Sequence, residues 1–170
     1  MKIQIKNISI ISLAIFFEYL RDYIFINLNI YIEFLQNINN GLNVINYTDT
    51  RLHDLIQSFS LELLINIKWT LSIGFAFIFF VIGVLFSKIN FNRKQHLKFT
   101  YLLSISGSLI LIISFLIFWA GQQLNVENEN NFYSISLELS HFVQSSLFPI
   151  SFFLISWSIN QYKIFNFKKL

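Results

Sequence analysis

Apolar residues fill four segments of the chain, and polar residues gather between them. Three segments, 63–87, 99–120 and 141–162, are long enough to cross a hydrocarbon core about 30 Å thick as helices. The fourth, 8–35, is uncharged as far as Phe17 and then carries ionisable residues among apolar ones. We expect one long helix there, whose first part crosses the membrane. The pattern predicts an all-α, integral membrane four-helix bundle that forms a single domain over residues 1–170.

A cleaved signal peptide is the competing interpretation of the N-terminus. Lys2 and Lys6 would form its basic region, and the apolar run that follows would form its core. A cleavage site with small residues should come next, but the sequence there reads "EYLR". We therefore interpret this segment as a membrane helix.

The longest connection, 36–62, predicts a short helix of its own. The Asn-rich stretch "QNINNGLN" forms a turn region, and "YTDTRLHDLIQSF" follows it. Asp49 or Thr50 can cap a helix. Apolar residues then recur at helical spacing: Leu52, Leu55, Ile56 and Phe59. We expect a short amphipathic helix on the outer leaflet or over the mouth of the bundle.

Composition agrees with a membrane protein. The 170 residues are 55% hydrophobic and 12% charged, whereas a soluble domain is about 25% charged. The chain has no cysteine, which excludes disulfides, thiolate metal sites and a cysteine nucleophile.

The distribution of charge predicts an orientation. Three segments carry Lys or Arg and no acid: Lys2 and Lys6, then Lys88, Arg93, Lys94 and Lys98, then Lys163, Lys168 and Lys169. The other two connections are acidic, with Arg51 as their only basic residue. The positive-inside rule therefore predicts a multi-pass membrane protein with both termini cytoplasmic.

Polar residues of several helices should meet near the outer face. Glu18, Arg21 and Asp22 share one helix face at i, i+3 and i+4. Lys68 and Trp69 lie at the outer end of the second helix, and four residues near the same face complete the layer: Gln122, Gln123, His141 and Gln144. A lone charge at this depth costs several kcal/mol.

We expect Asp22 to bridge to Lys68, because Glu18 can already pair with Arg21 along its own helix. Two interpretations of the whole layer stay open. In one, the charges fix the register of the helices and reach the interface. In the other, they form a site that opens to the outside.

No catalytic or cofactor motif accompanies this layer. His141 with Asp22 or Glu138 could make a base and its orienting acid, but no strand-turn-helix elbow presents a serine nucleophile. His53 and His96 should lie on opposite sides of the membrane, so the sequence does not predict a metal site, and no Gly-rich phosphate loop occurs. We expect no enzymatic activity, no cofactor and no nucleic-acid partner.

Two further stretches bear on the fold and on partners. The basic loop "SKINFNRKQHLK" is better explained as a topology signal beside anionic membrane lipid than as a nucleic-acid patch. Pro149 should kink the fourth helix, and Ser145 and Ser146 can satisfy the carbonyl groups that the kink frees.

Three motifs carry a family resemblance: "RDYIFINLN" at the end of the first helix, "YTDTRL" in the outer loop and "KWTLS" in the second helix. They resemble the small membrane proteins encoded beside exosortases in Bacteroidota. The resemblance covers roughly residues 18–85, and the later "SHFVQSSLFP" is only loosely similar. It singles out seven residues: Arg21, Asp22, Asn27, Asn29, Arg51, Lys68 and Trp69.

The resemblance implies an accessory role. Exosortases are transpeptidases that use a cysteine, which this chain lacks. The chain would instead bind or stabilise an exosortase or another membrane partner in protein sorting or a surface polysaccharide system. The rival hypothesis is a small proton-coupled transporter or carrier that uses Glu18, Asp22 and His141.

Overall fold

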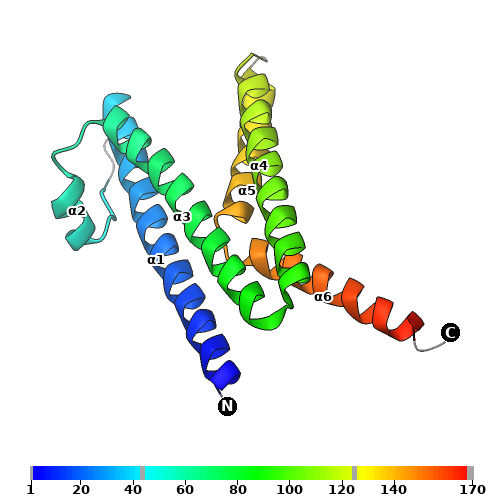
Figure 1. Ribbon diagram of the computed structural model, residues 1–170. Coiled ribbons are helices and arrows are strands. Elements are labelled where there is room, and N and C mark those ends of the chain that lie inside the picture. The colour runs from blue at the N-terminus through cyan, green and yellow to red at the C-terminus, as the bar shows by residue number, and fades with distance from the viewer. Residues whose placement is uncertain (1, 43–44, 124–125, 168–170) are drawn as a thin grey trace.

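The structure, a computed structural model, is all-helical (Figure 1). It describes the backbone of residues 2–42, 45–123 and 126–167, and the side chains of 4–42, 45–121, 123, 132 and 134–159. Six helices follow one another within these residues: α1 (Lys2–Asn39), α2 (Thr50–Ile56), α3 (Leu61–Asn90), α4 (Arg93–Gln123), α5 (Val126–Val143) and α6 (Leu147–Phe167).

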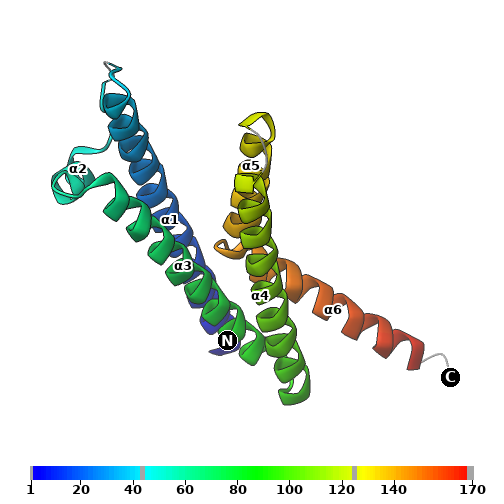
Figure 2. The ribbon, with the colours of Figure 1, turned by 90° about the horizontal axis from the view of Figure 1, so that it is seen from above.

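The long helices form two pairs. α1 packs along α3, and α5 packs along α4. A short turn at residues 91–92 joins the pairs, which diverge from that end in both ribbon views (Figures 1 and 2). α6 turns away from α5 and leads the chain to the side, while α2 lies beside the far end of the α1–α3 pair (Figure 1).

Polar caps set the ends of these helices. Asn92 and Gln95 form a reciprocal capping pair before α4, because each side-chain oxygen accepts the other residue's backbone N–H, at 3.0 and 3.4 Å. Ser60 caps α3 by accepting the N–H of Leu63. Gly41 follows the end of α1 with a φ of 77°, a conformation that glycine adopts without steric cost.

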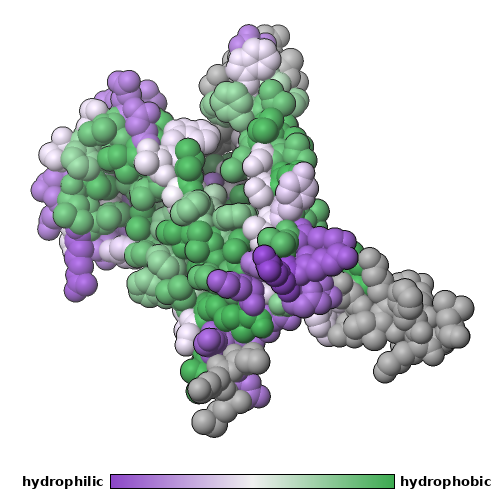
Figure 3. Space-filling view, in the orientation of Figure 1, coloured by the Kyte–Doolittle hydropathy of each residue, from purple (hydrophilic) through white to green (hydrophobic). Residues whose placement is uncertain are grey.

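Three apolar clusters hold the helices together. Phe25 of α1 packs with Phe79 of α3, and Leu28 packs with Ile56 of α2. Leu103 of α4 and Phe148 of α6 belong to the third cluster, at the centre of the molecule. Outside these contacts many large apolar residues are exposed, and Figure 3 shows them over much of the visible face. Such a surface suits a lipid environment.

Two of the described helices, α3 and α4, are long and apolar enough to cross a membrane. A third span results if residues 134–143 of α5 and 147–159 of α6, which are bent by 64°, are counted as one. α1 is not among these helices, and its apolar run is interrupted by Glu18, Arg21 and Asp22. The length and composition of these helices are therefore compatible with a membrane protein.

The predicted helices 8–35, 63–87 and 99–120 lie within α1, α3 and α4. The predicted fourth helix, 141–162, is wrong as a single helix, because residues 144–146 separate α5 from α6. The preceding connection is itself mostly helix α5, which returns along α4. Sequence periodicity missed it because its first half is polar and acidic.

The short helix predicted within 36–62 is present as α2. Ile56 is buried, and Leu52 and Phe59 pack against the same cluster, as their spacing predicted. Leu55 is 69% exposed, because α2 presents it away from the α1–α3 pair.

Candidate functional site

The break between α5 and α6 lies in the middle of the molecule. Gln144 and Ser145 are both buried there. Pro149 lies in the first turn of α6, where the backbone N–H that proline lacks would have no partner within the helix. Ser145 Oγ donates to the carbonyl of Phe142 at 2.8 Å, which agrees with the predicted role of this serine. In the interior of a membrane protein, the remaining N–H and C=O groups of non-helical backbone must also find hydrogen-bond partners.

Glu18 and Arg21 of α1 satisfy the backbone on both sides of this break. The N–H of Ser146 donates to Glu18 Oε2 at 2.7 Å, and Arg21 Nη1 donates to the carbonyl of Gln144 at 2.9 Å. The two side chains also pair with each other at 2.8 Å. We call this pair the α1 clamp.

Each charge of the α1 clamp faces the helix end that favours it. Glu18 meets the N-terminus of α6, where the helix dipole is positive, and Arg21 meets the C-terminus of α5, where it is negative. The clamp explains why an apolar helix carries a carboxylate and a guanidinium one turn apart. It holds a broken helix in place.

The bridge expected between Asp22 and Lys68 does not form among the described residues. Asp22 instead accepts two hydrogen bonds from Arg21, at 2.6 and 3.1 Å, and its side chain is 52% exposed. Arg21 turns toward α5 because the break presents a free carbonyl, which a continuous fourth helix would not offer.

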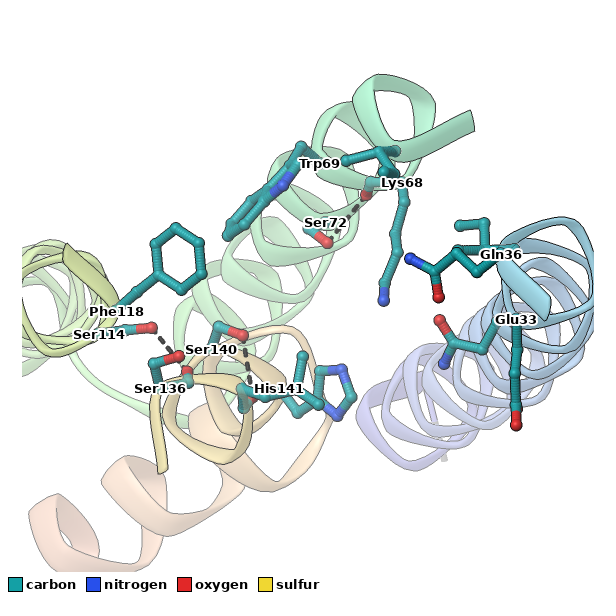
Figure 4. Close-up of a pocket in the computed structure, with 14 residues that line it drawn as sticks. Glu33, Gln36, Lys68, Trp69, Ser72, Ser114, Phe118, Ser136, Ser140 and His141 are labelled. Carbon is teal, nitrogen blue, oxygen red and sulfur yellow. Dashed lines mark hydrogen bonds between the residues drawn. The ribbon is translucent and has the colours of Figure 1, made fainter. Parts of the chain in front are cut away.

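Four predicted site residues line a cavity of about 490 Å³ between the two helix pairs: Asn29, Lys68, Trp69 and His141. Figure 4 shows that Lys68 extends from α3 toward Gln36 of α1, while His141 lies across the cavity on α5. We call this space the polar pocket. Gln36, Ser72 and Ser140 also line it, and they were not among the predicted residues of the polar layer.

Lys68 is a half-buried cation without a partner carboxylate. Among the described residues it belongs to no ion pair. Glu33 also lines the pocket, but Figure 4 shows its carboxylate turned away from the Lys68 ammonium. A charge in such a position is normally paired, so the pocket favours a ligand or partner group that is anionic or accepts hydrogen bonds.

Aromatic residues and hydroxyl groups form the walls of the polar pocket. Trp69 meets Phe118 of α4 edge to face, and the His141 ring meets Phe25 in the same way. Ser114 Oγ donates to the carbonyl of Ser136 at 2.6 Å, which fixes α4 to α5. Within the residues that the structure describes, no three His, Cys, Asp or Glu side chains gather to hold a metal ion.

Arg51 lies apart from the polar pocket, exposed on α2, with its backbone N–H donating to Asp49. Asn27 connects this loop to α1 through two hydrogen bonds. Its Nδ2 donates to the carbonyl of Tyr23 at 2.9 Å, and its Oδ1 accepts the N–H of Asp49 at 2.8 Å. The predicted polar layer is therefore divided into the α1 clamp, the polar pocket and this loop.

Parts of the predicted layer and of the charge pattern lie outside the described side chains: Lys2, Gln122, Glu127, Glu129, Lys163, Lys168 and Lys169. The sequence pattern placed Gln144 in the polar layer and Ser146 at a kink before Pro149. It did not predict that side chains of α1 would bond to the backbone of both residues.

The cap of α2 gives a pH dependence that can be tested. The Arg51 N–H, and then the Tyr23 hydroxyl, donate to Asp49 and hold the pKa of that carboxyl below its ordinary value. The stabilisation is therefore present above the unfolded-state pKa and is lost as the pH falls through the folded one. We expect the protection factors of the α2 amides to fall below about pH 4, and Asp49→Asn to remove this acid-dependent step. Equal profiles for both proteins would contradict this prediction.

Comparison of the chain with protein-family models, curated proteins and solved structures finds no match.

Proposed function

We propose that the protein is an accessory, multi-pass protein of the cell inner membrane that binds or stabilises a membrane partner. The observation that supports this proposal is Lys68, which has no ion-pair partner among the described side chains and lies in a polar pocket between two diverging helix pairs. The resemblance to proteins encoded beside exosortases suggests the partner class: an exosortase, or another membrane component of its sorting or surface polysaccharide system.

The proposed topology has four crossings, made by α1, α3, α4 and the bent α5–α6 unit. Charge supports it, since the α3–α4 turn and both terminal segments carry Lys or Arg without an acid. Both termini and this turn would be cytoplasmic, and the polar pocket would open toward the outer face. Glu18 and Arg21 in α1 fit this arrangement because they are paired and turned to the interior.

Reporter fusions test the topology. Fusions after Lys94 and after Lys169 should give cytoplasmic signals, and a fusion after Asn128 should give an external one. A cytoplasmic signal at Asn128 would contradict the four-crossing arrangement.

Partner binding through the polar pocket requires a group that complements Lys68. A carboxylate or carbonyl from a partner's membrane segment would supply it, and the half-exposed Trp69 would give apolar contact beside it. The two helix pairs diverge toward the end of the molecule that carries the polar pocket (Figures 1 and 2).

The test co-expresses the chain with an exosortase and purifies the two proteins together. Lys68→Gln should reduce the recovered exosortase about tenfold, equivalent to about 1.4 kcal/mol, at an unchanged level of the chain itself. The matched control is Lys88→Gln, which removes a cation from the other end of the same helix. Equal recovery with Lys68→Gln and Lys88→Gln would contradict docking at the pocket.

A second candidate is the proton-coupled carrier, and the broken α5–α6 unit favours it. Interrupted helices bind substrates and ions in several transporter folds. Glu18 lies at this break, and the buried Gln144 Oε1 has no hydrogen-bond partner among the described residues. His141 lies in the polar pocket, so a proton path would have to connect the two places.

One double variant separates the two candidates. In reconstituted vesicles a carrier should pass protons, and Glu18→Gln with Asp22→Asn should abolish that flux at an unchanged protein level. An accessory protein should pass none, and the same variant should lower the amount of folded protein, because Arg21 loses its partners. Normal abundance with lost flux would contradict the accessory role.

A further inference from the structure

A separate cavity of about 370 Å³ lies between the beginning of α4 and α6, at the end where the helix pairs meet. Its lining is amphipathic. Lys94, Gln95 and Lys98 of α4, with Ser156 of α6, provide the polar part, while Leu102 and Ile159 provide apolar surface beside it. We call it the lysine cavity.

The two lysines of this cavity repel each other. Lys94 and Lys98 are four residues apart, so their side chains lie on one helix face, where like charges are destabilising. Residues 88–98 contain no Asp or Glu, and neither lysine belongs to an ion pair among the side chains that the structure describes. A bound anion would remove this repulsion.

We propose that the lysine cavity binds the phosphate headgroup of an anionic phospholipid. Lys94 and Lys98 would neutralise the phosphate, and Gln95 and Ser156 would offer hydrogen-bond donors to its oxygens. The apolar surface of Leu102 and Ile159 would receive the first part of an acyl chain, which a free phosphate ion cannot use. Basic pockets between membrane helices commonly bind such headgroups. This site is separate from the polar pocket and needs no protein partner, and the inference rests on the proposed membrane location.

Trp157 provides a local reporter, because it follows Ser156 directly in α6 and is half exposed. The chain has three tryptophans, so Trp69→Phe with Trp119→Phe leaves Trp157 alone. This protein is placed in vesicles that contain either brominated phosphatidylglycerol or brominated phosphatidylcholine at the same mole fraction. We expect phosphatidylglycerol to bind several-fold more strongly, as measured by quenching of Trp157.

Charge-matched variants locate the effect. Lys94→Gln with Lys98→Gln should bring the ratio between the two lipids to about one, whereas Lys88→Gln with Arg93→Gln, outside the cavity, should preserve the preference. All four side chains are exposed, so the folded protein should tolerate the changes. Native mass spectrometry of lipid retained by the chain with all three tryptophans provides a second measurement.

Three results would overturn the proposal. One is equal quenching by both lipids in the reporter protein, together with equal retention by mass spectrometry. Another is an equal loss of preference in both double variants, which would indicate a general surface charge effect. The third is complete loss of the preference in millimolar inorganic phosphate at constant ionic strength, which would assign the cavity to free phosphate instead of lipid.

Discussion

Arg21→Met is expected to lower the free energy of unfolding by about 2–3 kcal/mol. Removing one partner of a buried ion pair costs about 3–5 kcal/mol, and the side chains of Arg21 and Glu18 keep 15% and 27% exposure, so the expected value lies below that range. The change also leaves the Gln144 carbonyl without its donor at the break between α5 and α6. Reversible unfolding in mixed micelles measures the difference.

The neighbouring Asp22→Asn serves as the control, because Asp22 is half exposed and contacts no backbone group of the break. Its effect should stay below about 1 kcal/mol. Adding Glu18→Gln to Arg21→Met should recover part of the loss, since no unpaired charge then remains. If Arg21→Met and Asp22→Asn cost the same, the α1 clamp has no structural importance.

Gly83→Ala should destabilise the protein by about 1–3 kcal/mol, a typical cost of overpacking. A Cβ at position 83 would lie 2.6 Å from Cβ of Pro149 and 3.1 Å from Cδ2 of Leu103. The Pro149 atom belongs to a rigid ring at the beginning of α6, so α3 and α6 must separate to admit a methyl group. The same unfolding measurement applies.

Gly74→Ala on the same helix is the matched control. Nothing lies within 4 Å of a Cβ built there, so the change should be neutral or stabilise by up to about 1 kcal/mol through helix propensity. The two substitutions are chemically identical and should differ in sign. A stabilising effect of Gly83→Ala would show that α6 does not pack against α3 as described.

The sequence alone was enough for the features that depend on local patterns. Three predicted helices lie within α1, α3 and α4. Spacing and capping chemistry predicted the short helix, with Asp49 as one of its two candidate caps, and the structure has Asp49 in that position. Lys68, Trp69 and His141 could be placed at one level because each lies near a helix end, and the structure brings them to one pocket. Hydrophobic length and cap residues need only neighbours along the chain.

The tertiary structure decided which groups meet across helices. Periodicity cannot show that residues 144–146 leave their helix, because this polar stretch is only three residues long and apolar residues flank it on both sides, as they would in one continuous helix. Periodicity also cannot show that Arg21 donates to the Gln144 carbonyl instead of lying beside Lys68 on α3. That contact depends on a free backbone carbonyl 123 residues away. The sequence determined that Glu18 and Arg21 need partners, and the packing of α1 against the α5–α6 break determined which partners they have.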